Sequence, residues 1–188
     1  MNLSASAPRH LMHKRSVECC GYEREDGLWD IEGHITDVKT YDEPNLGRGG
    51  VRSGEPIHDM WIRLTLDLDF RIHEVEACTV HGPYHTCADI VGNYKVLIGE
   101  TIKSGWTQRT RELLGGTKGC THLLELLGPV ATTAFQTLYA AREKRKPAGS
   151  DGVRPSLIDT CHSWSSSGPM VMRRYPAFYT GTRKKAEA

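Results

Sequence analysis

Apolar and polar residues alternate with a period of two in the first half of the chain. The alternation runs through residues 28–40 and returns in residues 57–79, with a turn near residues 67–69. Successive side chains of a strand point to opposite faces of a sheet, so this pattern is typical of half-buried strands. We therefore predict a small antiparallel sheet built from residues 22–40 and 57–79, with one face in water.

The period changes to that of a helix after Pro83. Apolar residues follow Cys87 at helical spacing, and similar patterns begin at Trp106 and at Thr121. In the last pattern Pro129 predicts an interruption or a kink, because proline lacks the N–H that a helix interior uses. Strands come first and helices follow, which predicts an α+β fold with the helices packed on one face of the sheet.

Three segments are expected from composition and periodicity. Residues 1–18 are rich in Ser, Pro, His and basic residues without periodicity, so we expect a mobile N-terminal arm. Residues 19–181 are expected to form a single α+β domain, because a core of this size fits one domain. Residues 182–188 are expected to be a flexible tail.

Composition narrows the classes of partner. The 188-residue chain has 24 Lys and Arg against 23 Asp and Glu, and the formal net charge of +1 gives no electrostatic reason to expect nucleic acid or an anionic membrane. No run reaches the roughly 18 apolar residues of a membrane helix, and residues 1–17 lack the apolar core of a secretory signal. We expect a cytoplasmic protein with six reduced cysteines. Its expected partner is a small-molecule substrate, and a homo-oligomer is compatible with the sequence.

Two cysteines stand directly before predicted helices. Cys87 and Cys120 would each lie at a helix N-terminus, where free N–H groups and the helix dipole stabilise a thiolate. They form a metal pair or activated thiols in one interpretation, and small buried hydrophobic residues in the other. Cys161 and His162 are a further possible donor pair, and a structural role is the alternative.

Two pairs of residues are considered for proton transfer. His58 and Asp59 are adjacent on a predicted strand and must point to opposite faces, and we favour Asp59 as a base or metal ligand. The alternative for Asp59 is a carboxylate that caps a turn. His122 and Glu125 share a helix face, which suits a proton-transfer pair, although His122 could equally be a core histidine.

Several aromatic residues could line a pocket. We expect Trp61, Tyr84, Tyr94 and Trp106 to bind a flat organic ligand, and Arg63 to bind its carboxylate. The alternative is that the aromatic residues belong to the core and that Arg63 lies on a solvated face.

Three segments carry a resemblance to a known family. Residues 21–37 (GYEREDGLWDIEGHITD), 54–64 (GEPIHDMWIRL) and 119–129 (GCTHLLELLGP) resemble the bacterial domain-of-unknown-function family 2889. The similarity covers roughly residues 21–181. The family's description implies no mechanism.

A more distant similarity is to the NifU/IscU-like iron–sulfur scaffold proteins. Residues 59–64 and 70–77 resemble the hairpin of that fold, and Cys87 stands where its second ligand would fall. Cys120 and the residues after it resemble the His-Cys-Ser-x-Leu start of its last helix. The resemblance implies the same topology and a metal set of Asp59, Cys87 and Cys120. The chain departs from the scaffold pattern because Ile57 or His58 replaces the first cysteine and no histidine precedes Cys120.

Two functional hypotheses follow. In the first, a small catabolic enzyme acts on a small organic substrate, aromatic compounds included, by acid–base chemistry of the lyase type. Asp59 or His122 removes a proton, with Glu125 as the partner of His122, while Cys87 and Cys120 activate the substrate or hold a metal. In the second, a non-enzymatic scaffold binds zinc or an iron–sulfur cluster. Zinc, iron and the absence of a cofactor all stay open.

Overall fold

The structure, a computed structural model, describes residues 3–145 and 152–182. It divides into two compact units, residues 1–144 and 145–188. The expectation of a single α+β domain over residues 19–181 stays a prediction. In the second unit, the described residues 152–182 form short helices and no strand. Most of the predicted C-terminal tail, residues 183–188, lies outside the described residues.

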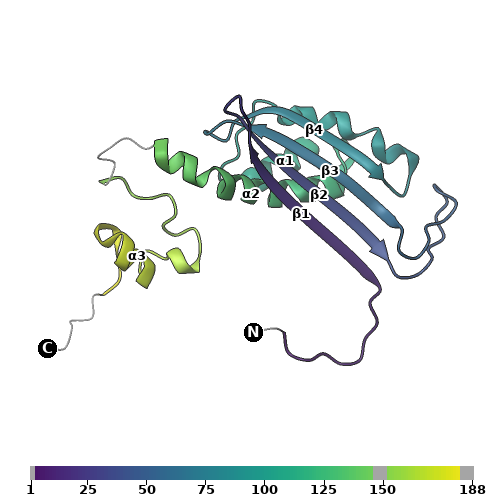
Figure 1. The fold of residues 1–188 in the computed structure, drawn as a ribbon, viewed down its shortest axis with the longest axis horizontal. Helices are drawn as coiled ribbons and strands as arrows, with labels where there is room; N and C mark the ends of the chain where they lie inside the picture. Colours follow the sequence, from purple (N-terminus) through teal and green to yellow (C-terminus); the bar gives the residue numbers. More distant parts are fainter. Residues whose placement is uncertain (1–2, 146–151, 183–188) are drawn as a thin grey trace. The chain divides into compact units, whose positions relative to one another are not determined.

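The first unit contains a four-stranded antiparallel sheet (Figure 1). Its strands are β1 (His13–Glu23), β2 (Trp29–Lys39), β3 (Pro56–Leu66) and β4 (Ile72–His81), and they pair in the order β1-β2-β3-β4. The predicted α+β fold is therefore confirmed. β1 begins at His13, six residues before the expected start of the domain at residue 19, so residues 13–18 belong to the sheet and not to an arm. Most side chains of β1 are exposed, and the sequence therefore shows no hydrophobic alternation there.

The alternation in β2 assigns its residues to two different faces. Trp29, Ile31 and Ile35 are buried on the side that packs against the helices, which we call the helix face. The residues between them are half-buried on the other side, which we call the polar face. Gly33 lies on the helix face, where an added Cβ would come within 2.6 Å of Val130 Cγ2. The missing side chain thus allows the long helix to approach β2 closely.

Helical elements follow the sheet and lie along one side of it (Figure 1). They are η1 (His85–Ala88), η2 (Val91–Leu97), α1 (Trp106–Leu114), η3 (Gly116–Lys118) and α2 (Thr121–Arg145). The helices predicted at Trp106 and Thr121 are confirmed. The segment after Cys87 forms two short 3₁₀ turns instead of an α-helix, because Gly92 and the nearby Gly99 favour turns over a regular helix. Pro129 lies inside α2, and the helix continues past it.

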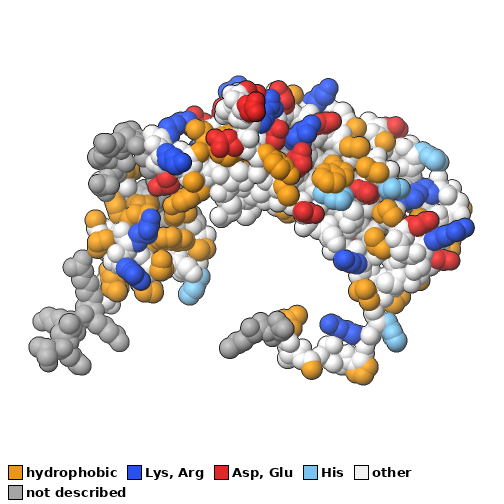
Figure 2. All heavy atoms as spheres, in the orientation of Figure 1, with side chains coloured by type: hydrophobic (Ala, Val, Ile, Leu, Met, Phe, Trp, Pro, Cys, Tyr) orange, Lys and Arg blue, Asp and Glu red, His pale blue; other side chains and the backbone are white. Residues whose placement is uncertain are grey.

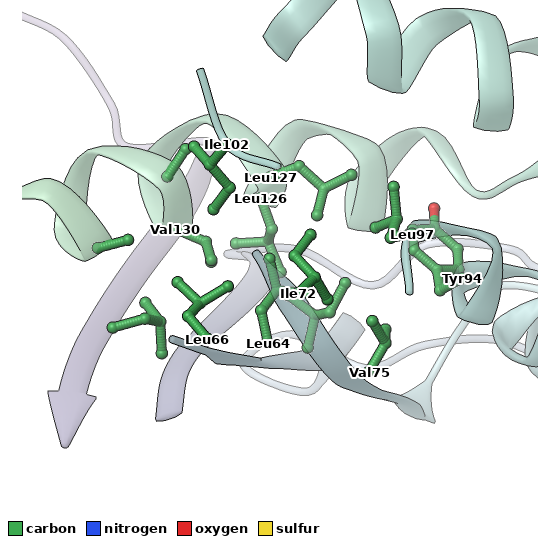
Figure 3. Packing of buried hydrophobic residues seen from close by; sticks show 14 of the residues in the cluster. Leu64, Leu66, Ile72, Val75, Tyr94, Leu97, Ile102, Leu126, Leu127 and Val130 are labelled. Carbon is green, nitrogen blue, oxygen red and sulfur yellow. The ribbon is translucent and has the colours of Figure 1, made fainter. Parts of the chain in front are cut away.

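The core lies between the helix face and α2. Leu126, Leu127 and Val130 of α2 are at most 1% exposed, and Figure 3 shows them close to Leu64 and Leu66 of β3. Burial of such side chains contributes about 1.5–3 kcal/mol each relative to exposure. This packing holds α2 against the sheet. The first turn of α2 lies beside the end of β2 and the start of β3, where the polar cluster described below is found.

The second unit contains η5 (His162–Trp164), α3 (Pro169–Arg174) and η6 (Pro176–Phe178). Asp159 organises it, since its backbone N–H donates to the carbonyl of Trp164 and its carboxylate accepts from the backbone N–H of Ser166. Cys161 is exposed. Among the described residues, no helix is both long and apolar enough to span a membrane.

Candidate functional site

A buried carboxylate near the end of β2 is the centre of the candidate site. The side chain of Asp37 is 1% exposed. Its Oδ1 lies 2.7 Å from His13 Nε2 and 2.8 Å from Arg15 Nε, and its Oδ2 lies 2.7 Å from Arg15 Nη2 and 3.0 Å from His58 Nδ1. Each carboxylate oxygen thus accepts two hydrogen bonds, which is about the capacity of an ionised carboxyl group.

The register of the sheet brings these residues together. Arg15 of β1 is opposite Asp37 of β2, and Asp37 is opposite His58 of β3. The three residues therefore form one row across three strands, with side chains on the helix face. A β-bulge lies between Asp37 and Val38, next to this row. Bulges of this kind redirect side chains and are common beside functional sites.

The hydrogen bonds keep Asp37 ionised. Burial alone would raise the pKa of its carboxyl group, but hydrogen bonds from Arg15 and His13 and the charge of Arg15 lower that pKa to about 2. Asp37 in turn raises the pKa of Arg15 above its usual value. The pair is therefore a fixed carboxylate and a fixed guanidinium over the physiological range.

A second histidine reaches the carboxylate from the first turn of α2. The ring of His122 lies against the ring of His58 in a tilted arrangement, with centroids 3.7 Å apart and an interplanar angle of 31°, and His122 Nε2 lies 3.9 Å from Asp37 Oδ2. Burial lowers the pKa of both histidines. Charge repulsion adds to this effect, from Arg15 for His122 and from the protonated form of His122 for His58, while the charge of Asp37 opposes it. Both imidazoles are thus neutral near pH 7 and able to accept a proton.

The predicted pair of His122 and Glu125 lies at this cluster. Glu125 Oε2 is 2.6 Å from Arg15 Nη1, so Arg15 connects Glu125 to Asp37. The side chain of Glu125 is 54% exposed, whereas that of His122 is 23% exposed. Glu125 therefore lies at the exposed border of the cluster, and His122 is the more shielded of the two.

Cys120 stands between this cluster and the core. Its Sγ lies 3.9 Å from His122 Nδ1 and 3.7 Å from Met60 Sδ. Its backbone is bound on both sides by Tyr94, whose hydroxyl donates to the Cys120 carbonyl at 2.8 Å and accepts from the Cys120 N–H at 3.1 Å. Burial raises the pKa of Tyr94, which keeps this phenol protonated. Tyr94 thus fixes the start of α2, and a catalytic role for Cys120 stays a prediction.

The predicted metal set of Asp59, Cys87 and Cys120 does not converge. Asp59 lies on the polar face, where its Oδ1 is 2.9 Å from His34 Nε2, while the neighbouring Met60 is in the core and contacts Cys120. Asp59 and Cys120 are therefore separated by the sheet, because successive strand residues point to opposite faces. Cys87 is in η1, beside Gly82. These positions do not support the predicted metal set.

The predicted aromatic residues do not all line one pocket, although Trp61 and Arg63 together line a pocket on the polar face. Tyr94 and Trp106 are core residues, 0% and 7% exposed, and the Trp106 indole donates to the Leu127 carbonyl. Trp61 and Tyr84 are 40% and 59% exposed. Arg63 lies on the polar face and pairs with two glutamates, one from each neighbouring strand. The predicted residues are thus split between the core and the polar face. Trp61 and Arg63 alternate along β3 with its buried residues and therefore point away from the core.

Sequence reasoning missed Arg15, Asp37 and His13, and it assigned the pocket to Asp59 instead of His58. One signal was present in the sequence. Asp37 occupies the same phase of β2 as Trp29 and Ile31, whose side chains are buried. A carboxylate in the apolar phase of a strand predicts a buried charge that needs partners.

The same cluster offers the ligands for a metal ion. One ligand atom from each of Asp37, His58 and His122 lies within 4.8 Å of the other two. Among the described residues, these three form the group of His, Cys, Asp or Glu side chains that could hold a metal ion. The geometry fits an ion poorly in two respects. Arg15 already neutralises Asp37, and the rings of His58 and His122, which lie against each other, cannot aim their in-plane lone pairs at one point unless one ring turns.

The fold and the site together define a class of protein. It is an antiparallel α+β domain in which a buried aspartate and two histidines lie between the sheet and the start of a long helix. The chain belongs to the DUF2889 family, described as a protein of unknown function, whose model matches residues 13–136. The match begins with β1 and ends within α2, so it covers the whole sheet and the Asp37 cluster. Neither the curated proteins nor the solved structures contain a match to the chain. The NifU/IscU-like topology therefore stays a prediction.

Proposed function

We propose that the protein is an enzyme that transfers protons on a small organic substrate at the Asp37 cluster. The single observation that carries this proposal is the contact of His58 Nδ1 with the buried carboxylate at 3.0 Å. An ionised carboxylate accepts, so His58 carries its proton on Nδ1 and has a free lone pair on Nε2. A neutral histidine oriented in this way by an aspartate is suited to act as a general base.

The cluster can supply both halves of a lyase-type elimination. His58 Nε2 removes a proton from carbon, and the electrons of that C–H bond form the new double bond as the neighbouring carbon–oxygen bond breaks. The imidazolium then returns the proton to the leaving oxygen, and no other reactant is needed. Asp37 stabilises the imidazolium while it exists. The ring of His122 provides a flat surface beside the base, which suits a planar substrate, aromatic compounds included.

A cytoplasmic location belongs to the same proposal. All six cysteines are in the described residues and are free thiols. Free thiols persist in a reducing compartment. The proposal therefore places the enzyme among cytoplasmic proteins that act on small metabolites.

The second candidate function is a zinc or iron site formed by Asp37, His58 and His122. It is favoured by the proximity of the three ligand atoms, all within 4.8 Å of one another. We rank it second because Arg15 neutralises the carboxylate and the imidazole rings lie against each other. Metal analysis of protein purified without added metal separates the two. Near-stoichiometric zinc or iron that is lost in His122→Gln would favour the metal site.

The proposal is tested by proton exchange, because removal of a proton from carbon is visible even when a product does not accumulate. A panel of small hydroxy acids and aromatic acids is incubated with the protein in deuterated water, and loss of C–H signals is followed by proton NMR. The test variant is His58→Gln. The matched control is His73→Gln, since His73 also contacts an aspartate, Asp67, at 2.8 Å, but is 40% exposed and lies outside the cluster.

We expect exchange or elimination on at least one compound. The rate should fall by about 100-fold or more in His58→Gln, the usual contribution of a general base, and stay unchanged in His73→Gln. Absence of exchange across the panel, or equal rates in His58→Gln and the wild type, would contradict the proposal.

A further inference from the structure

A second group of histidines surrounds a carboxylate on the polar face. Asp59 of β3 lies between His34 of β2 and His81 of β4. Its Oδ1 is 2.9 Å from His34 Nε2, and its Oδ2 is 3.8 Å from His81 Nδ1. The side chains of Asp59 and His34 are 21% and 22% exposed and that of His81 is 40% exposed, so the group is open to ions from solvent. Figure 2 shows charged side chains and histidines gathered over the strands.

One atom of this group lacks a partner. His81 Nδ1 is shielded from solvent and has no hydrogen-bond partner. Its 3.8 Å separation from Asp59 Oδ2 is too long for a hydrogen bond. Two metal–ligand bonds of about 2.1 Å span roughly 3.4 Å at a tetrahedral angle and roughly 4.2 Å in a line. The 3.8 Å separation therefore lies within the range that two such bonds to one ion would span.

The charge around Asp59 also differs from that around Asp37. Arg15 pairs with Asp37 through two hydrogen bonds, whereas the ion pairs of the described residues give Asp59 no Lys or Arg partner. Its negative charge is thus available to a cation. Histidine nitrogen with carboxylate oxygen is a ligand set that suits zinc, cobalt and nickel.

We propose that the polar face binds a divalent transition-metal ion between Asp59 Oδ2 and His81 Nδ1. His34 holds the other carboxylate oxygen in place from outside the coordination shell, and water completes that shell. Trp61 fixes the orientation of His34, because the two rings are stacked with centroids 3.8 Å apart and planes 9° apart. This site is independent of the Asp37 cluster, which lies on the helix face.

Cobalt(II) is the probe, because it is paramagnetic and its absorption reports its ligands. The full chain is titrated with the metal, and the broadening of the Trp61 indole signal is followed by proton–nitrogen NMR, with the signal assigned by its loss in Trp61→Phe. The variants are Asp59→Asn, His81→Gln and His34→Gln. His73→Gln is the matched control, since His73 contacts Asp67 without a second histidine.

We expect saturable broadening that is lost in Asp59→Asn and in His81→Gln. The affinity should fall by roughly 10- to 100-fold in His34→Gln, as is usual when a residue that orients a ligand is removed, and stay unchanged in His73→Gln. The cobalt spectrum should show no thiolate charge-transfer band. His81→Gln at the partly exposed end of β4 provides the test should Asp59→Asn fail to fold.

Three results would overturn the proposal. The first is a wild-type protein without saturable broadening, which would mean that no metal ion reaches His81 Nδ1. The second is binding that survives His81→Gln in a folded variant. The third is a thiolate band, or loss of binding in His58→Gln, which would assign the ion to cysteines or to the Asp37 cluster.

Discussion

Replacement of Asp37 by asparagine is the sharpest perturbation of the proposed site. It keeps the shape of the side chain and removes the charge that Arg15 neutralises. It also replaces one acceptor oxygen by an NH₂ group that faces donors on both sides. Because the side chain is 1% exposed, solvent cannot compensate for these losses. We therefore expect a large loss of stability from a change of very few atoms.

The pKa of Asp37 sets the magnitude of that loss. Its carboxyl pKa falls from the usual 3.8 to about 2 in the folded protein. Since one pKa unit corresponds to about 1.4 kcal/mol, the charged form contributes about 2 kcal/mol to the free energy of unfolding. Arg15, whose side chain is 33% exposed, then loses its main partner but stays within reach of water, so this further cost is well below the about 3 to 5 kcal/mol of breaking a fully buried pair. We expect Asp37→Asn to lose about 2 to 4 kcal/mol near neutral pH.

The pH dependence gives the sign. The folded pKa lies below the unfolded pKa, so the contribution of Asp37 is fully present above the unfolded value and is lost as pH falls through the folded value. At about pH 3 the wild type should have lost about 1 kcal/mol of the stabilisation that the Asp37 carboxylate contributes. Asp37→Asn has no carboxyl group at this position and should show no such loss. Urea denaturation of both proteins, from about pH 7 down to about pH 3, measures the difference.

Glu125→Gln is the matched control, because it removes the other carboxylate partner of Arg15 from a side chain that is 54% exposed. An exposed ion pair contributes about 0 to 1 kcal/mol, so this variant should change stability little. If Asp37→Asn stays within about 0.5 kcal/mol of the wild type, or keeps its dependence on acid, the stabilisation of the charged carboxylate has been misjudged.

Two further predictions concern the histidines and the sheet. The pKa values of His58 and His122 are lowered by burial, so their contribution is present above the unfolded value of 6.5 and lost as pH falls through the folded values. His58→Gln should therefore flatten the rise of unfolding free energy between about pH 5 and pH 7.5 by up to about 1.4 kcal/mol per pH unit, as measured by urea denaturation. Gly33→Ala should cost about 1 to 3 kcal/mol, because its Cβ would lie 2.6 Å from Val130 Cγ2. Thermal unfolding of Gly33→Ala, of its combination with Val130→Ala and of Gly92→Ala, whose Cβ would meet nothing within 4 Å, checks the origin of this cost.

The sheet and the two main helices could be predicted because their signals are local. The period of two in β2 and β3 and the helical spacing after Trp106 and Thr121 depend only on residues near in sequence. β1 could not be predicted in full, since its side chains are mostly exposed and only pairing with β2 defines it. The 3₁₀ segments η1 and η2 were mistaken for an α-helix. A 3₁₀-helix also repeats about every three residues, so over a short segment its apolar spacing resembles that of an α-helix.

The site could be predicted only in part, because it depends on the register between strands. His122 and Glu125 were found from their spacing on one helix face. Arg15 and Asp37 are 22 residues apart, and they meet only because β1 and β2 pair with Arg15 opposite Asp37. A sequence without a known register does not contain this information, and a shift of one residue would have placed Arg15 on the other face.

The adjacent residues His58 and Asp59 explain how one strand serves two sites. The phase of β3 directs His58 to the helix face, where it meets Asp37, and Asp59 to the polar face, where it meets His34. Each histidine thus contacts an aspartate of the neighbouring strand, and the sheet separates the two pairs. No single small molecule can contact both Asp37 and Asp59. A substitution of Asp59 therefore tests the proposed metal binding on the polar face while the Asp37 cluster keeps its own contacts.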